Sequence, residues 1–160
     1  MFEETDRKLC IICSKGTLDM AYPGLVLANA ALMEGIDVTM FFTFWGLDMI
    51  NKKKMNDLKF VPIGNPTMGI PNAVGGLPGM TNIATKMMKK EIAQLDFPEV
   101  GEFLDVIVDS GGKMYACKMS VDMFEDMNMM AEEDLYDGIE GVVGATDFME
   151  MSEGAQIIFI

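Results

Sequence analysis

The sequence predicts an α/β fold: one domain over residues 1–160, built on a doubly wound and mostly parallel sheet. Three observations support this prediction. Short apolar runs typical of buried strands alternate along the chain with longer segments typical of helices. The first 45 residues contain a strand, a helix and a second strand, an order that fixes a parallel pair. Half of the residues are hydrophobic, enough for a full core in a chain of this length.

The first β-α-β unit is defined by its pattern of apolar residues. Residues 8–13 (KLCIIC) form a continuous apolar run, as in a strand buried on both faces. A helix is predicted over residues 18–34, and Gly35 ends it because glycine accepts the left-handed conformation that often follows a helix. Residues 36–42 are rich in β-branched and aromatic side chains and are predicted as the second strand.

The middle of the chain contains a long loop at residues 60–79, in which nine prolines and glycines prevent regular structure. A short helix over residues 47–55 precedes this loop, and helices over residues 81–94 and 98–110 follow it. The loop is also apolar, so we interpret it either as a lid over the site or as a contact in a homo-oligomer, a dimer or a trimer.

The last third of the chain continues the alternation of strand and helix. Gly111 and Gly112 separate the preceding helix from a strand that ends at Cys117. The elements predicted after this strand are a helix over 120–130, a turn over 132–137, a strand over 141–144, a helix over 145–151 and a strand over 156–160.

The composition excludes several functions. The net charge is −13 and Arg7 is the single arginine, so nucleic acid is not an expected partner. The chain has no histidine, which removes Cys-His hydrolases and, with three scattered cysteines, a tetrahedral metal site. Residues 1–8 are charged and lack the apolar region of a signal peptide, and no apolar stretch reaches the roughly 20 residues that span a bilayer. We therefore expect a cytoplasmic protein with free thiols and no bound cofactor.

Cys117 is the main candidate for chemistry. It ends a short apolar strand in the run KMYACKMS (residues 113–120) and stands directly before a helix. Ligands bind at the carboxyl ends of strands in open α/β sheets, so we expect this thiol to be exposed there. The amides of the helix and the ammonium group of Lys118 favour a thiolate, so we expect the Cys117 pKa to lie below that of an ordinary thiol.

The other two cysteines form a Cys-x-x-Cys string inside the first strand. Their odd spacing points Cys10 and Cys13 to opposite faces of the sheet, so they do not form a thioredoxin-type dithiol. Cys10 is predicted as a core residue. If the strand order is 2-1-3-4-5, the strand of Cys13 neighbours that of Cys117, and Cys13 is then a candidate second thiol; packing in the core is the competing interpretation.

The loop Ser14-Lys15-Gly16-Thr17 follows the first strand. Its position before a helix suits a small anion such as thiosulfate or a sulfonate, held by helix amides. Capping of the helix by Ser14 or Thr17 is the competing interpretation. The loop lacks both the Walker pattern and the Gly-x-Gly-x-x-Gly fingerprint of nucleotide sites.

Three segments together resemble the DsrE/DsrF-like family of small sulfur-relay proteins, and within it a Met-rich, long-loop branch labelled peroxiredoxin-like. They are residues 14–19, the Gly/Pro-rich middle with Met80 and residues 86–90, and the motif Ala-Cys-Lys-Met-Ser at residues 116–120. The resemblance implies a flavodoxin-like fold, assembly into oligomers, and Cys117 as the acceptor of sulfane sulfur with Lys118 and Ser120 beside it. It also implies small sulfur-carrier or rhodanese-like proteins as partners.

The leading hypothesis is therefore a sulfurtransferase or sulfur carrier that holds a persulfide on Cys117. The alternative is a non-enzymatic, oligomeric flavodoxin-like module that binds a partner or a small ligand. A thiol peroxidase is disfavoured because such an enzyme needs an arginine beside its cysteine, and Arg7 precedes the first strand at the opposite edge of the sheet.

Overall fold

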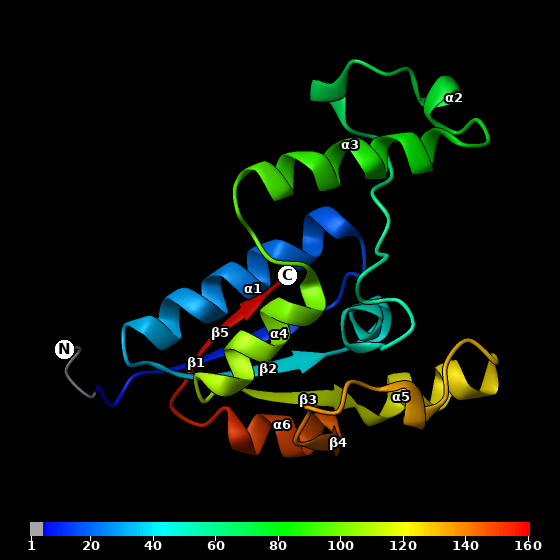
Figure 1. The fold of residues 1–160 in the computed structure, drawn as a ribbon. Helices are drawn as coiled ribbons and strands as arrows, with labels where there is room; N and C mark the ends of the chain where they lie inside the picture. The colour runs from blue at the N-terminus through cyan, green and yellow to red at the C-terminus, as the bar shows by residue number, and fades with distance from the viewer. Residues whose placement is uncertain (1–4) are drawn as a thin grey trace.

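The computed structural model describes residues 5–160 and contains a five-stranded, all-parallel sheet with the order β4-β3-β2-β1-β5 (Figure 1). The first four residues of the charged N-terminal segment lie outside the described residues. The predicted α/β fold is confirmed. The strands are β1 (Lys8–Cys13), β2 (Asp37–Phe42), β3 (Lys113–Cys117), β4 (Gly141–Val143) and β5 (Gln156–Phe159).

Six α-helices connect or cover these strands in the described part of the chain: α1 (Leu18–Met33), α2 (Asn72–Gly75), α3 (Met80–Gln94), α4 (Val100–Asp109), α5 (Lys118–Asp126) and α6 (Ala145–Met151). Most predicted boundaries are correct to within a few residues. The helix predicted over residues 47–55 is wrong: the chain instead forms a 3-10 helix over Phe44–Ile50, directly after β2. Across the described residues we find no helix with the length and apolar character needed to cross a bilayer.

The two faces of the sheet are covered unequally (Figure 1). Helices α1 and α4 lie over one face, where the main core forms. Helix α6 covers the other face, where a second, small cluster forms. Fully buried side chains of the main core include Ile11, Leu25, Met40, Leu104, Ile107 and Met114. The small cluster consists of Cys10, Phe41, Cys117 and Phe148.

The observed strand order corrects one premise of the sequence analysis. Strand β2 lies between β1 and β3 and pairs with both, so the order 2-1-3-4-5 is wrong. Cys13 and Cys117 therefore do not end neighbouring strands. The reason is that β5, the last strand of the chain, takes the place beside β1 that the alternative order gives to β3.

The long loop at residues 60–79 is not wholly irregular, contrary to the prediction, because it contains a 3-10 turn at Pro66–Met68 and the single turn of α2. This loop and α3 together project from the sheet as an arm (Figure 1). The loop turns back on itself, since a side chain added at Gly75 would meet Ile63 and Pro62. The loop runs away from the sheet, and Cys117 is covered by Phe41 and Phe148, so in this structure the loop is not a lid over the thiol. Several large apolar side chains of the arm are exposed: Val61, Ile63, Val74, Leu77, Ile83, Met87 and Leu95.

Two glycines allow the ends of β1 and β2 to pack backbone against backbone. A Cβ atom at Gly46 would lie 1.9 Å from the carbonyl oxygen of Cys13, and one at Gly16 would lie 2.3 Å from that of Trp45. The Thr43 amide also donates to the Cys13 carbonyl at 3.0 Å. Because a Cβ cannot occupy either place, these glycines fix the shape of the carboxyl edge.

We expect Gly46→Ala to destabilise the protein by about 3 kcal/mol, because the new methyl group must displace the backbone of β1. Urea denaturation measures the loss. The matched control is Gly141→Ala, since a Cβ at Gly141 meets no atom within 4 Å; we expect a change within about 0.5 kcal/mol. Equal stabilities of the two variants would contradict the close packing described above.

Candidate functional site

Cys117 is the last residue of β3 and the N-cap residue of α5. The strand end is therefore also the helix start, as the sequence predicts. The expected exposure is wrong: Cys117 is only 5% exposed and packs in the small cluster with Phe41 and Phe148. The rings of these two phenylalanines stack with their centroids 4.5 Å apart. The thiol therefore lies beneath α6, sheltered from solvent.

The hydroxyl group of Ser120 is the central polar group beside the thiol. Ser120 is fully buried, and its oxygen accepts a hydrogen bond from the Phe44 amide at 2.9 Å. The Thr43 hydroxyl lies 3.1 Å from the same oxygen. Since Thr43 and Phe44 follow β2 directly, Ser120 ties the end of β2 to the first turn of α5. Thr43 was not predicted from the sequence. The pattern that could have indicated it is a hydroxyl residue directly after a strand, at the carboxyl edge of the sheet.

Two opposing influences act on the Cys117 pKa. Burial raises it, because the charged thiolate loses hydration. Hydrogen-bonding groups lower it: the side chain and amide of Ser120, the hydroxyl of Thr43 and the amide of Met119. The second influence is larger, so the Cys117 pKa lies below its ordinary value. The predicted direction is therefore supported, with hydroxyl groups and helix amides as its cause.

Lys118 pairs with a carboxylate and not with the Cys117 thiolate, the partner that the sequence suggests. Its ammonium group forms an ion pair with Asp122, one turn further along α5, and this carboxylate raises the Lys118 pKa. The side chain is about half exposed. Lys118 is not among the groups that lower the Cys117 pKa.

The three cysteines are free and buried, and they are not brought together. Cys13 points into the main core, where its sulfur would lie 3.1 Å from a Cβ atom at Gly24 of α1. Burial raises the Cys13 pKa to about 12. Cys10 points to the opposite face, as its odd spacing from Cys13 predicts, and burial raises its pKa as well. The geometry thus favours core packing over a second reactive thiol for Cys13.

The residues of the loop at positions 14–17 have separate roles. Ser14 donates to the Ile160 carbonyl twice, from its amide at 2.7 Å and from its hydroxyl at 2.9 Å. Thr17 is the N-cap residue of α1, but its side chain makes no capping hydrogen bond. Gly16 packs on the backbone of Trp45. Lys15, Gly16 and Thr17 line a cavity of about 490 Å³.

Within residues 5–160, no group of three or more Cys, Asp or Glu residues is arranged to hold a metal ion.

The fold and the site define a class of protein: a small, open α/β domain that carries a thiolate-favouring cysteine at the junction of a strand and a helix. Within this class, the chain belongs to the DsrE/DsrF/DrsH-like family, which it matches over residues 5–160. This match confirms the resemblance predicted from the sequence.

Individual relatives support the same assignment. The chain is 36% identical over 159 residues to the sulfur carrier protein DsrE2 of Allochromatium vinosum, covering 94% of this chain and 96% of that protein. It is also 25% identical over 170 residues to the uncharacterized protein YrkE of Bacillus subtilis, with both chains fully covered.

Solved structures support the fold alone. A protein of unknown function from Methanobacterium thermoautotrophicum, MTH1491, superposes with a TM-score of 0.59 at 11% identity, covering 97% of this chain and all of that one. The conserved protein of unknown function BT1422 from Bacteroides thetaiotaomicron gives a TM-score of 0.54 at 14% identity, covering 98% and 97% of the two chains. The domain is thus an α/β domain of the flavodoxin-like type.

We expect Ser120→Ala to raise the Cys117 pKa, because a hydroxyl donor to the thiolate is lost. The pH dependence of alkylation, measured by mass spectrometry, should shift its midpoint to higher pH. The control is Lys118→Ala, which we expect to leave the midpoint in place because Asp122 holds this ammonium group. A shift caused by Lys118→Ala and not by Ser120→Ala would contradict this assignment.

Proposed function

We propose that this protein is a sulfur carrier or sulfurtransferase that holds sulfane sulfur as a persulfide on Cys117. The observation that carries the proposal is the position of this thiol: it caps α5, with hydroxyl groups and amides that favour the thiolate. A thiolate is the form that attacks a donor sulfur. Relationship to a sulfur carrier supports a role in sulfur relay.

The proposed step needs no base, metal or oxidant. The Cys117 thiolate attacks the outer sulfur of a donor persulfide, R–S–SH. The new bond joins the Cys117 sulfur to that outer sulfur, and the bond between the two donor sulfurs breaks. The donor leaves as the thiolate R–S⁻, and Cys117 becomes Cys–S–SH. The reverse attack by an acceptor thiolate on the outer sulfur returns Cys117 to its starting form.

Burial serves this role in one respect and limits it in another. A persulfide formed beneath Phe148 is shielded from water and oxidants. Transfer, however, requires that the covering side chains move, because Cys117 is 5% exposed. We propose that the donor or acceptor is a small sulfur-carrier or rhodanese-like protein, whose docking displaces this cover. Exposed apolar side chains at the same edge, Phe44 and Met119, suit such a contact.

The proposed setting is the cytoplasm, where thiols stay reduced. The absence of disulfides among Cys10, Cys13 and Cys117 is compatible with that setting.

We expect the intact protein to gain the mass of one sulfur atom after incubation with polysulfide, because a single thiolate accepts it. Peptide mass spectrometry should place the added sulfur on Cys117. Cys117→Ser should lose the gain, and Cys13→Ser, a matched buried thiol with a raised pKa, should retain it. Uptake that persists in Cys117→Ser would contradict the assignment.

We also propose that the arm formed by the loop at residues 60–79 and α3 packs against a neighbouring subunit in a dimer or trimer. Its exposed side chains include Leu77 (55%), Ile83 (64%) and Leu95 (69%), and a monomer rarely leaves such apolar surface in water.

Light scattering tests this assembly. We expect a dimeric or trimeric mass for the wild type and a monomeric mass for Ile83→Glu, because a buried, unpaired carboxylate is costly in an interface. The control is Met33→Glu, which changes a similarly exposed side chain (57%, against 64% for Ile83) at the end of α1. A monomeric wild type at micromolar concentration would exclude the proposed assembly.

A further inference from the structure

The cavity beside the loop at residues 14–17 has an aromatic wall and a basic rim. It measures about 490 Å³, a volume typical of small-molecule sites. Trp45, which is 46% exposed, forms one wall together with Leu58 and Val61. The cavity opens at the carboxyl edge of the sheet, because Gly16 follows β1 and Trp45 follows β2. This edge is the usual position for ligands in open α/β sheets.

The charge at this cavity is opposite to that of the whole protein. The chain carries a net charge of −13, yet four lysines and only two aspartates line the cavity. The lining lysines are Lys15, Lys53, Lys54 and Lys59, and the aspartates are Asp48 and Asp57.

The ion pairs leave one of these lysines available. Lys54 pairs with Asp48 at 2.9 Å, and Lys59 pairs with Asp57 at 2.9 Å. Lys53 forms an ion pair with Asp134, which lies outside the cavity lining. Lys15 forms no ion pair with any residue in the described range 5–160, so its ammonium group is free to meet an anion.

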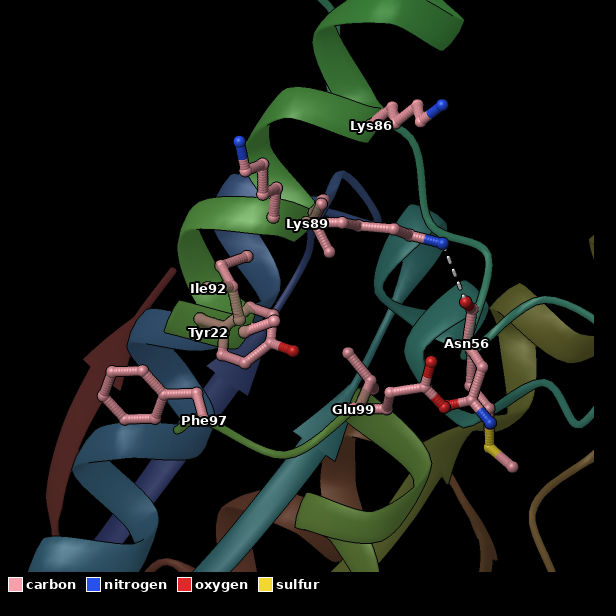
Figure 2. Close-up of a pocket in the computed structure, with 12 residues that line it drawn as sticks. Tyr22, Asn56, Lys86, Lys89, Ile92, Phe97 and Glu99 are labelled. Carbon is pink, nitrogen blue, oxygen red and sulfur yellow. Dashed lines mark hydrogen bonds between the residues drawn. The ribbon is translucent and has the colours of Figure 1, made fainter. Parts of the chain in front are cut away.

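A neighbouring cavity strengthens this local positive charge. It measures about 360 Å³ and lies between α3 and the body of the protein, with Lys86, Lys89 and Lys90 in its lining (Figure 2). Figure 2 shows Lys89 reaching across to Asn56, whose carbonyl oxygen it meets at 3.0 Å. The same ammonium group lies 3.5 Å from Asp57, so this carboxylate is shared by two lysines. Lys59 makes the closer contact, at 2.9 Å to each of the two Asp57 oxygens.

We propose that the cavity at Trp45 binds a small aromatic phosphate, such as a mononucleotide. The flat ring packs against the Trp45 indole, and the phosphate meets Lys15, with Lys59 beside it. The wall is preformed, because the Gly16 backbone packs directly on the Trp45 carbonyl and the Trp45 ring packs on Phe124 at 5.1 Å. Preformed walls reduce the entropy lost on binding.

This site goes beyond the proposed sulfur chemistry and does not depend on it. Its ligand contacts involve Lys15 and Trp45, whereas the Cys117 thiol points to the face of the sheet covered by α6. Binding should therefore be the same in Cys117→Ser, and a failure of either proposal leaves the other intact.

The single tryptophan makes the test direct, because Trp45 fluorescence reports from the cavity wall alone. The probes are AMP and its two halves, adenosine and inorganic phosphate, each titrated into the full-length protein. We expect AMP to change the Trp45 emission in a saturable way and to bind at least tenfold more tightly than either half. Isothermal calorimetry should give the same dissociation constant for AMP.

Matched variants then assign the contacts. Lys15→Ala should weaken AMP binding about five- to tenfold, as expected for the loss of one charge-assisted contact, and Lys113→Ala, a lysine at the start of β3, should not change it. Calorimetry on Trp45→Ala should show a comparable loss. Equal binding of AMP and adenosine, no saturable binding of AMP, or no difference between Lys15→Ala and Lys113→Ala would overturn the proposal.

Discussion

The candidate site depends on one buried hydroxyl group, that of Ser120. A fully buried polar group must keep its hydrogen bonds, because leaving it unpaired costs about 1–3 kcal/mol. Ser120 meets this requirement through the Phe44 amide and the Thr43 hydroxyl. These contacts fix the start of α5 against the end of β2, and the same hydroxyl favours the Cys117 thiolate. Structural and chemical roles therefore coincide in one side chain.

The close backbone packing at Gly16 and Gly46 has a similar double consequence. It draws the chain after β2 onto the end of β1, which places Thr43 at the thiol. Phe44, next in the chain, adopts a positive φ of 47°, a conformation that non-glycine residues rarely take. Trp45, the next residue, forms part of the wall of the basic cavity. Three consecutive residues thus connect two distinct sites.

The unequal cover of the sheet explains why the thiol is sheltered yet close to the surface. Helix α6 has seven residues and buries Phe148 over Cys117, whereas the main core on the other face is built from α1, α4 and their neighbours. A short helix with a small apolar contact is easier to displace than a main-core helix. This arrangement suits a group that must be both protected and transferred.

The sequence by itself determined the strands, most helix boundaries, the strand-to-helix junction at Cys117 and the opposite directions of Cys10 and Cys13. These features depend on local periodicity and on residues such as Gly35, whose positive φ of 73° ends α1 as predicted. Only the tertiary structure decided the strand order, the burial of Cys117, the pairing of Lys118 with Asp122 and the contact between Thr43 and Ser120. Each of these depends on which distant segments pack together, and a pattern within one segment carries no information about that choice.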